Sequence, residues 1–330
     1  MQVFPFLVML LAPPSAGSAT DAETSAATPV AVTGAAPVSV TEGSAVTPDG
    51  VRLHYRVAGR GGEVVLAPFA LYHGASLDPL ADGRRIVTYD PRGRGRSQAV
   101  PPDKVSLDLL LSDLDTVRRA IGAEQVSLIG WSGAGMETFV YALRNPGRVR
   151  RLVQLAPVGP RLAPYGAQMM VDRQARTDPA AAAALVERVE AGAFVGNPAA
   201  HCRASNAVTN PPLLADPART GLIPDVCHWS NEHPERLGRY FGALFPTIEG
   251  YNWRSSLSAV AIPRLVIHAS RDNIPLAGSE EWVRGQPNAR ILLIENSGHF
   301  PQHEQPEATL SAIAEFLDGR WPAEARSLSD

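Results

Sequence analysis

The sequence has no excess of basic charge and no apolar run long enough to cross a membrane. Its 330 residues include 30 Lys and Arg against 33 Asp and Glu, for a net charge of −3. Lys104 is the only lysine, which we attribute to coding bias rather than to function. The apolar run at residues 3–12 has ten residues, whereas a bilayer span needs about 20. Neither nucleic acid nor an anionic membrane surface is therefore an expected partner, and no stable membrane insertion is expected.

Cysteine is also scarce. Only Cys202 and Cys227 are present, and because neither directly follows the apolar run, a lipoprotein anchor is excluded. Histidines adjoin both cysteines, but the short C-x2-C spacing that brings metal ligands together is missing, so no metal is expected. The two residues form either a disulfide or a pair of buried free thiols, and we favour the disulfide.

The first 37 residues differ from the rest of the chain. Small residues, Gly17-Ser18-Ala19, follow the apolar run, which predicts a signal peptide over residues 1–19 and a secreted or periplasmic protein. A mis-set start codon or an apolar tail is the alternative. Residues 20–37 are rich in Ala, Thr and Ser and lack large apolar side chains, which predicts a disordered linker.

From residue 38 onward the chain reads as alternating strands and helices. A turn signal, Thr47-Pro48-Asp49-Gly50, separates two alternating segments and predicts a β-hairpin. Helices are expected at 106–122, 178–191 and 234–244. Short runs that are apolar at nearly every position predict buried strands at 63–67, 85–89, 125–129, 151–155, 264–268 and 290–294. The pattern is typical of a parallel α/β sheet.

Residues whose side chains can act in catalysis follow three of these strands. Ser132 lies between a strand and a helix in Gly-Trp-Ser-Gly-Ala-Gly, Asp272 follows the strand at 264–268, and His299 follows the strand at 290–294. A serine on a sharp strand-to-helix turn needs small neighbours two residues away, and Gly130 and Ala134 meet that demand. The order Ser, Asp, His is that of a nucleophile-elbow hydrolase, so these three are the predicted catalytic triad.

With these motifs the chain resembles the α/β-hydrolase superfamily over about positions 47–318. The resemblance is carried by TPDGVRLHYRVAG, YDPRGRGRS, GWSGAG, SRDNIP and GHFPQHEQPE. The Arg-Gly-x-Gly-Arg-Ser and Gly-His-Phe-Pro segments are similar to those of proline-iminopeptidase-like hydrolases. The resemblance implies an α/β-hydrolase fold: a mostly parallel eight-stranded sheet with helices on both faces and an inserted helical cap. The predicted division is a core at 38–159 and 256–320 and a cap at 160–255.

Family members usually have His-Gly after the third strand, where a backbone amide helps to form the oxyanion hole. Here Ala67-Pro68 stands in those places, so the amides of Phe69 and Gly133 are the predicted donors. A competing alignment places the donor at His73-Gly74. The serine mechanism needs no cofactor.

The predicted function is that of a serine hydrolase which cleaves a small ester, amide or peptide bond through an acyl-enzyme. The alternatives are a prolyl aminopeptidase and a catalytically silent binding protein, and the expected partner is a small-molecule or peptide substrate. An aminopeptidase needs an anionic subsite for the substrate ammonium. Four acids in the predicted cap are available, although solvated helix faces explain them equally well: Glu187, Glu190, Glu232 and Glu235. The triplet Arg92, Arg94 and Arg96 is expected on a surface turn, with an ion pair or two to the cap.

Overall fold

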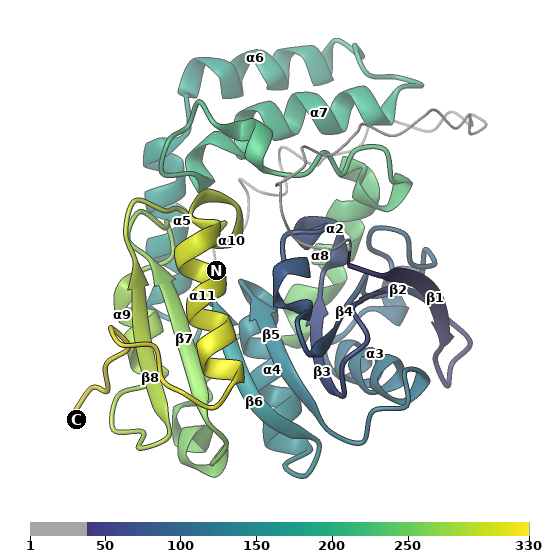
Figure 1. Ribbon diagram of the computed structural model, residues 1–330. Helices are drawn as coiled ribbons and strands as arrows, with labels where there is room; N and C mark the ends of the chain where they lie inside the picture. The colour runs from purple at the N-terminus through teal and green to yellow at the C-terminus, as the bar shows by residue number, and fades with distance from the viewer. Residues whose placement is uncertain (1–37, 330) are drawn as a thin grey trace.

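A computed structural model describes residues 38–329, so the predicted signal peptide and linker lie outside the described residues. The core is an eight-stranded sheet in the order β1-β2-β4-β3-β5-β6-β7-β8 (Figure 1). Strands β1 and β2 pair in antiparallel fashion, as do β2 and β4, whereas all later neighbours are parallel. The mostly parallel sheet implied by the resemblance is confirmed. The strands are β1 Val40–Val46, β2 Arg52–Ala58, β3 Glu63–Pro68, β4 Arg84–Tyr89, β5 Val126–Trp131, β6 Val149–Leu155, β7 Arg264–Ala269 and β8 Ala289–Ile294.

Both faces of the sheet are covered, which explains why its strands are apolar at nearly every position. Successive residues of β3 enter opposite core clusters: Val64 and Leu66 pack with helices α3 and α4, whereas Val65 and Ala67 pack with η1 and α11. The core helices are α2 Ala70–His73, η1 Asp78–Ala81, η2 Pro102–Lys104, α3 Leu107–Ala120, α4 Gly133–Arg144, α9 Leu276–Glu281, α10 Pro301–Glu304 and α11 Pro306–Leu317.

The segment between β6 and β7 is helical. We call residues 160–255 the insertion, after the predicted cap. Helices α6 and α7 lie beyond the end of the sheet where the parallel strands finish (Figure 1). The elements between β6 and β7 are α5 Tyr165–Arg176, α6 Pro179–Glu190, α7 Pro198–Thr209, η3 Pro211–Leu213, η4 Thr220–Leu222, η5 Ser230–Glu232, α8 Pro234–Thr247 and η6 Arg254–Ala259.

The expected helices in the core and the insertion begin at side-chain or proline signals. Ser106 caps α3 by accepting from the Leu109 amide, and Asp178 caps α6 by accepting from two amides of its first turn. Proline occupies the first position of both α6 and α8, where a missing N–H costs nothing. Helices α5 and α7 were not among the expected elements.

A disulfide joins Cys202 of α7 to Cys227, so the predicted bridge is present and no described cysteine is free. The bridge closes a loop within the insertion and ties α7 to the stretch before η5. None of the helices in residues 38–329 is long and apolar enough to cross a membrane.

Candidate active site

Ser132 lies on a strained turn between β5 and α4. Its backbone has φ 56° and ψ −124°, a region that a non-glycine residue seldom adopts. The close approach of strand and helix explains its neighbours: a Cβ on Gly130 would lie 2.2 Å from the Thr138 hydroxyl and 2.3 Å from the Ala134 carbonyl. Ala134, which replaces the usual glycine, is fully buried. The turn therefore presents the serine side chain at the carboxyl end of the sheet.

The other two predicted residues converge on this serine. His299 follows β8, and its Nε2 lies 2.9 Å from the Ser132 Oγ. Asp272 follows β7, and its two carboxylate oxygens lie 3.1 and 3.0 Å from the His299 Nδ1. The amide of Ile274 donates to the same carboxylate and orients it. Asp272 and His299 are buried, whereas Ser132 is partly exposed and can be reached by a substrate.

Two backbone amides near Ser132 are candidates for the oxyanion hole. Gly133 is the first residue of α4, so its N–H has no partner within that helix. Phe69 directly follows β3, which pairs with β5, and its left-handed backbone (φ 67°, ψ 53°) turns the chain at the level of the nucleophile turn. Its amide donates to no carbonyl within the described residues. The Gly74 amide of the competing alignment donates instead to Ala70 O, so the geometry favours Phe69.

The loop that carries His299 is held by a carboxylate to which the sequence analysis gave no role. Glu304 is buried, and one of its oxygens accepts from the amides of Gly298 and Phe300, which flank the histidine, at 2.8 and 3.3 Å. Its other oxygen accepts from the Ala215 amide of the insertion at 2.8 Å. Burial raises the pKa of Glu304 above its usual value, while these donors oppose the shift. The available signal was an acid five residues after the histidine, within the motif GHFPQHEQPE.

An aromatic cluster packs beside the triad. The Trp131 indole donates to the His299 carbonyl at 2.7 Å, and the two rings lie 4.9 Å apart. Tyr72 packs against Trp131 at 5.1 Å, and Phe300 does so at 4.8 Å. These contacts fix both the loop and the ring plane of the histidine. Trp131 was visible in the nucleophile motif, but its spacing alone gave no reason to assign it this role.

The arginine triplet departs from the prediction of a surface turn. Arg96 is exposed and pairs with Glu42, as expected of a surface residue. Arg92 and Arg94 are instead almost completely buried, so for these two the prediction is wrong. Arg92 pairs with Asp113 of α3 at 2.6 Å, and Arg94 pairs with Glu232 of the insertion at 2.8 Å. Both cations can be buried because each has a carboxylate partner from another part of the sequence. The pair of Arg94 with Glu232 is an ion pair to the insertion, as the sequence predicted.

Of the four acids considered for an ammonium subsite, only Glu232 is buried. Its carboxylate is occupied: it accepts from Nε and Nη2 of Arg94 and from the Gly95 amide. The Arg94 guanidinium also lies 5.2–5.9 Å from the rings of four aromatic residues, Phe69, Tyr72, Tyr240 and Phe241. The charge of Glu232 is therefore compensated, and the other three acids are exposed.

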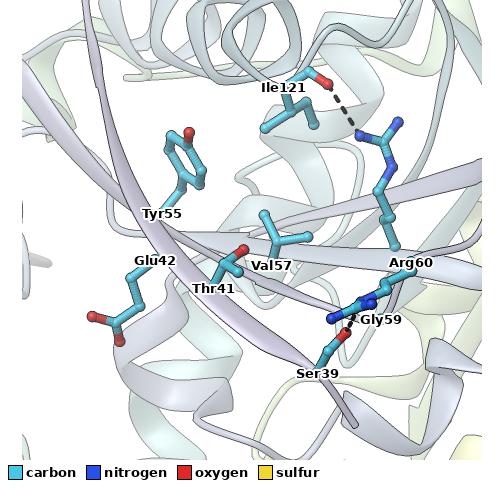
Figure 2. A pocket seen from close by; sticks show the side chains of 9 residues that line it. Ser39, Thr41, Glu42, Tyr55, Val57, Gly59, Arg60 and Ile121 are labelled. Carbon is cyan, nitrogen blue, oxygen red and sulfur yellow. Dashed lines mark hydrogen bonds between the residues drawn. The ribbon is translucent and has the colours of Figure 1, made fainter.

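A pocket away from the triad contains no comparable set of catalytic side chains. It lies against β1 and β2 and is lined by Ser39, Thr41, Glu42, Tyr55, Val57, Gly59, Arg60, Arg85 and Ile121 (Figure 2). Arg60 donates to Ser39, and Arg85 donates to the Ile121 carbonyl. In the described part of the chain, no cluster of His, Cys, Asp and Glu is arranged to hold a metal ion.

Comparisons with known proteins agree with this fold. A family model described as alpha/beta hydrolase fold matches residues 66–306. A proline iminopeptidase of Clostridioides difficile (strain 630) is 23% identical over 291 residues, which cover 82% of this chain and 95% of the relative.

Two solved structures share the fold. A serine hydrolase of Cycloclasticus zankles has a TM-score of 0.63 at 19% identity, covering 85% of this chain and 99% of its own. A thermophilic esterase of Thermogutta terrifontis has a TM-score of 0.62 at 23% identity, covering 84% and 98%.

Proposed function

Because the chain belongs to the alpha/beta hydrolase fold family and is a hydrolase, we propose that it is a serine hydrolase that cleaves a small ester, amide or peptide bond through an acyl-enzyme. The observation that carries the proposal is the continuous hydrogen-bonded chain from Ser132 through His299 to Asp272. A silent binding protein of the same fold would have no need to keep these three side chains in hydrogen-bonding register.

The proposed reaction starts with proton transfer. With Nδ1–H donating to Asp272, the Nε2 of His299 is free to accept the Ser132 hydroxyl proton as the oxygen attacks the substrate carbonyl. Asp272 stabilises the imidazolium that forms. The amides of Phe69 and Gly133 donate to the oxygen of the tetrahedral intermediate, and one such donor is worth about 3 to 4 kcal/mol in a comparable site.

In the second half of the reaction, His299 gives its proton to the leaving alcohol or amine, which departs and leaves Ser132 acylated. Water then attacks the acyl carbonyl, and His299 accepts a proton from it. Collapse of the second intermediate releases the acid and returns the proton to the serine.

The site favours an ester or neutral amide over the amino-terminal substrate of an aminopeptidase. A substrate ammonium needs a carboxylate that is free to bind it, and Glu232 already pairs with Arg94. The resemblance to proline iminopeptidases keeps the aminopeptidase as the second candidate. We further propose a secreted or periplasmic location, which the Cys202–Cys227 disulfide supports because such bonds persist in oxidising compartments.

The test is covalent labelling by a fluorophosphonate probe. The wild-type protein should be labelled, and Ser132→Ala should not. The control Ser112→Ala, which changes a half-buried serine on α3, should be labelled as the wild type is. Equal labelling of Ser132→Ala and wild type would refute the nucleophile assignment. Hydrolysis of p-nitrophenyl butyrate but not of proline p-nitroanilide supports the esterase, and the reverse preference supports the aminopeptidase.

A further inference from the structure

Helix α5 of the insertion is fixed to the loop that carries the triad acid. Arg176, in the last turn of α5, donates to the Arg271 carbonyl at 2.5 Å and to the Asp272 carbonyl at 3.1 Å. Arg173 lies three residues earlier and therefore on the same face of the helix. The anchored end of α5 thus brings a second guanidinium close to the catalytic loops.

A second contact locates the Arg173 side chain. Its Nη2 donates at 3.2 Å to the carbonyl of Thr209, the last residue of α7, and η3 begins two residues later. The Leu213 carbonyl in η3 accepts from the His299 amide at 2.6 Å. The Arg173 side chain therefore joins α5 to the end of α7, and the next element, η3, accepts a hydrogen bond from the backbone of the catalytic histidine.

The charge of Arg173 also acts on Tyr72 in the core. The Tyr72 ring packs on Trp131, the residue before the nucleophile. Burial raises the pKa of the Tyr72 hydroxyl, and the positive charges of Arg94 and Arg173 both oppose that shift. Arg173 therefore lies within electrostatic range of Tyr72.

Arg173 has fewer partners within the described residues than the buried arginines have. Arg92 and Arg94 each have a carboxylate partner, and Arg264 donates to two carbonyls and lies over the Phe139 ring. Within residues 38–329, Arg173 pairs with no carboxylate, and its side chain is partly exposed. Burial lowers the pKa of Arg173, which reflects the cost of enclosing a cation without a counter-charge.

We infer that Arg173 binds a carboxylate on the substrate, so that the enzyme acts on esters or amides that carry a second, anionic end. The inference rests on the proposed serine mechanism and adds the substrate class. A carboxylate would supply the missing counter-charge and accept two parallel hydrogen bonds from the guanidinium. A substrate ammonium would be repelled by the same side chain, in line with the pairing of Glu232 with Arg94.

The experiment compares matched charged and neutral esters. For a charge in the acyl part, the p-nitrophenyl monoester of glutaric acid is compared with p-nitrophenyl pentanoate. For a charge in the alcohol part, 3-acetoxybenzoate is compared with phenyl acetate. Rates are corrected with Ser132→Ala, because a neighbouring carboxylate accelerates spontaneous hydrolysis of some monoesters. The measured quantity is the ratio of kcat/KM for the charged ester to that for its neutral partner.

In Arg173→Gln this ratio should fall about 10- to 100-fold for at least one pair, the range expected for loss of a charge-assisted hydrogen bond. The loss should be in KM, activity on the neutral ester should change less than about threefold, and Arg173→Lys should restore part of the preference. Arg203→Gln, which removes an exposed arginine from α7 of the insertion, is the matched control and should leave both ratios unchanged.

The outcomes separate this inference from the proposed function. If Arg173→Gln lowers kcat/KM for the charged and the neutral esters equally, the arginine has only a structural role and the inference is overturned. A ratio that is unchanged for both pairs overturns it as well. In either case fluorophosphonate labelling of Ser132 still supports the serine hydrolase, whereas a wild-type protein that resists labelling refutes the proposed function itself.

Discussion

Glu137 on α4 is a buried carboxyl whose ionisation should destabilise the fold. It is 8% exposed, and no hydrogen bond to its carboxyl forms within the described residues. Burial raises the pKa of Glu137 from 4.5 to about 7, with the Asp113 charge adding to the shift and the Arg94 charge opposing it. At 1.36 kcal/mol per pKa unit, this change corresponds to about 3 kcal/mol.

The direction of the pH effect on stability follows from the pKa of Glu137 in the folded and in the unfolded protein. Below pH 4.5 the carboxyl is protonated in both the folded and the unfolded protein, so it contributes no difference. Between pH 4.5 and about 7 the unfolded chain ionises first, and the free energy of unfolding falls. Glutamine resembles the protonated carboxyl in shape and cannot ionise. Glu137→Gln should therefore match the wild type at low pH and exceed its stability by up to about 3 kcal/mol above pH 7.

Urea unfolding of the wild type and of Glu137→Gln at pH 4.5, 6 and 8 measures the difference directly. Glu190→Gln, which removes an exposed acid on α6, is the control and should stay within about 0.5 kcal/mol of the wild type at each pH. A stability difference between Glu137→Gln and wild type that does not grow with pH would refute the reasoning, as would a variant that is less stable at pH 8.

Two further substitutions test how the insertion and the catalytic loop are joined. Glu304→Gln replaces one accepting oxygen with an N–H2 group that faces a backbone N–H, so the histidine loop should shift and kcat should fall about 10- to 100-fold with little change in KM. Glu232→Ala leaves Arg94 buried without its counter-charge and should lower the free energy of unfolding by about 3 to 5 kcal/mol, measured by urea unfolding.

Each of these two substitutions has a control at an exposed acid close to it in the sequence. Glu307→Gln removes an exposed acid from the first turn of α11, and Glu235→Ala removes one from the first turn of α8. Both should keep kcat and stability close to the wild type. A kcat for Glu304→Gln equal to that of Glu307→Gln would contradict the positioning role. A loss in Glu232→Ala no larger than in Glu235→Ala would show that the buried pair contributes little.

The sheet and the predicted triad could be read from the sequence because their signals are local. A strand buried on both faces must be apolar along its length, and residues at the carboxyl ends of parallel strands meet at one edge. The positions of Ser132, Asp272 and His299 after three such strands therefore predicted that the side chains lie together, although the residues are far apart in the sequence. Their mutual distances of about 3 Å follow from the shared edge.

Helices α5 and α7 of the insertion were harder to predict because few of the residues that they bury are large and apolar. In α5 only Tyr165 is buried, and the less exposed face of the helix ends in Arg173. Helix α7 begins with Pro198-Ala199-Ala200, and two of the four residues that it buries, His201 and Ser205, are polar. Contacts made by polar groups hold α5 instead, through Arg173 and Arg176, and hydrogen bonds from arginine to backbone carbonyls leave no pattern along the chain.

The charge of the site shows why residue counts do not predict specificity. Four glutamates in the predicted cap and a resemblance to iminopeptidases left a subsite for a cation open, although solvated helix faces explained the same acids equally well. Whether a buried acid can bind a ligand depends on its partner, and Arg94, which is 138 residues away in the sequence, already neutralises Glu232. Arg173 has no such partner, and it lies on the face of α5 that meets the catalytic loops. With Glu232 paired to Arg94, Arg173 remains beside the catalytic loops as an arginine without a carboxylate partner in the described part of the chain, which is consistent with an enzyme for anionic esters or amides.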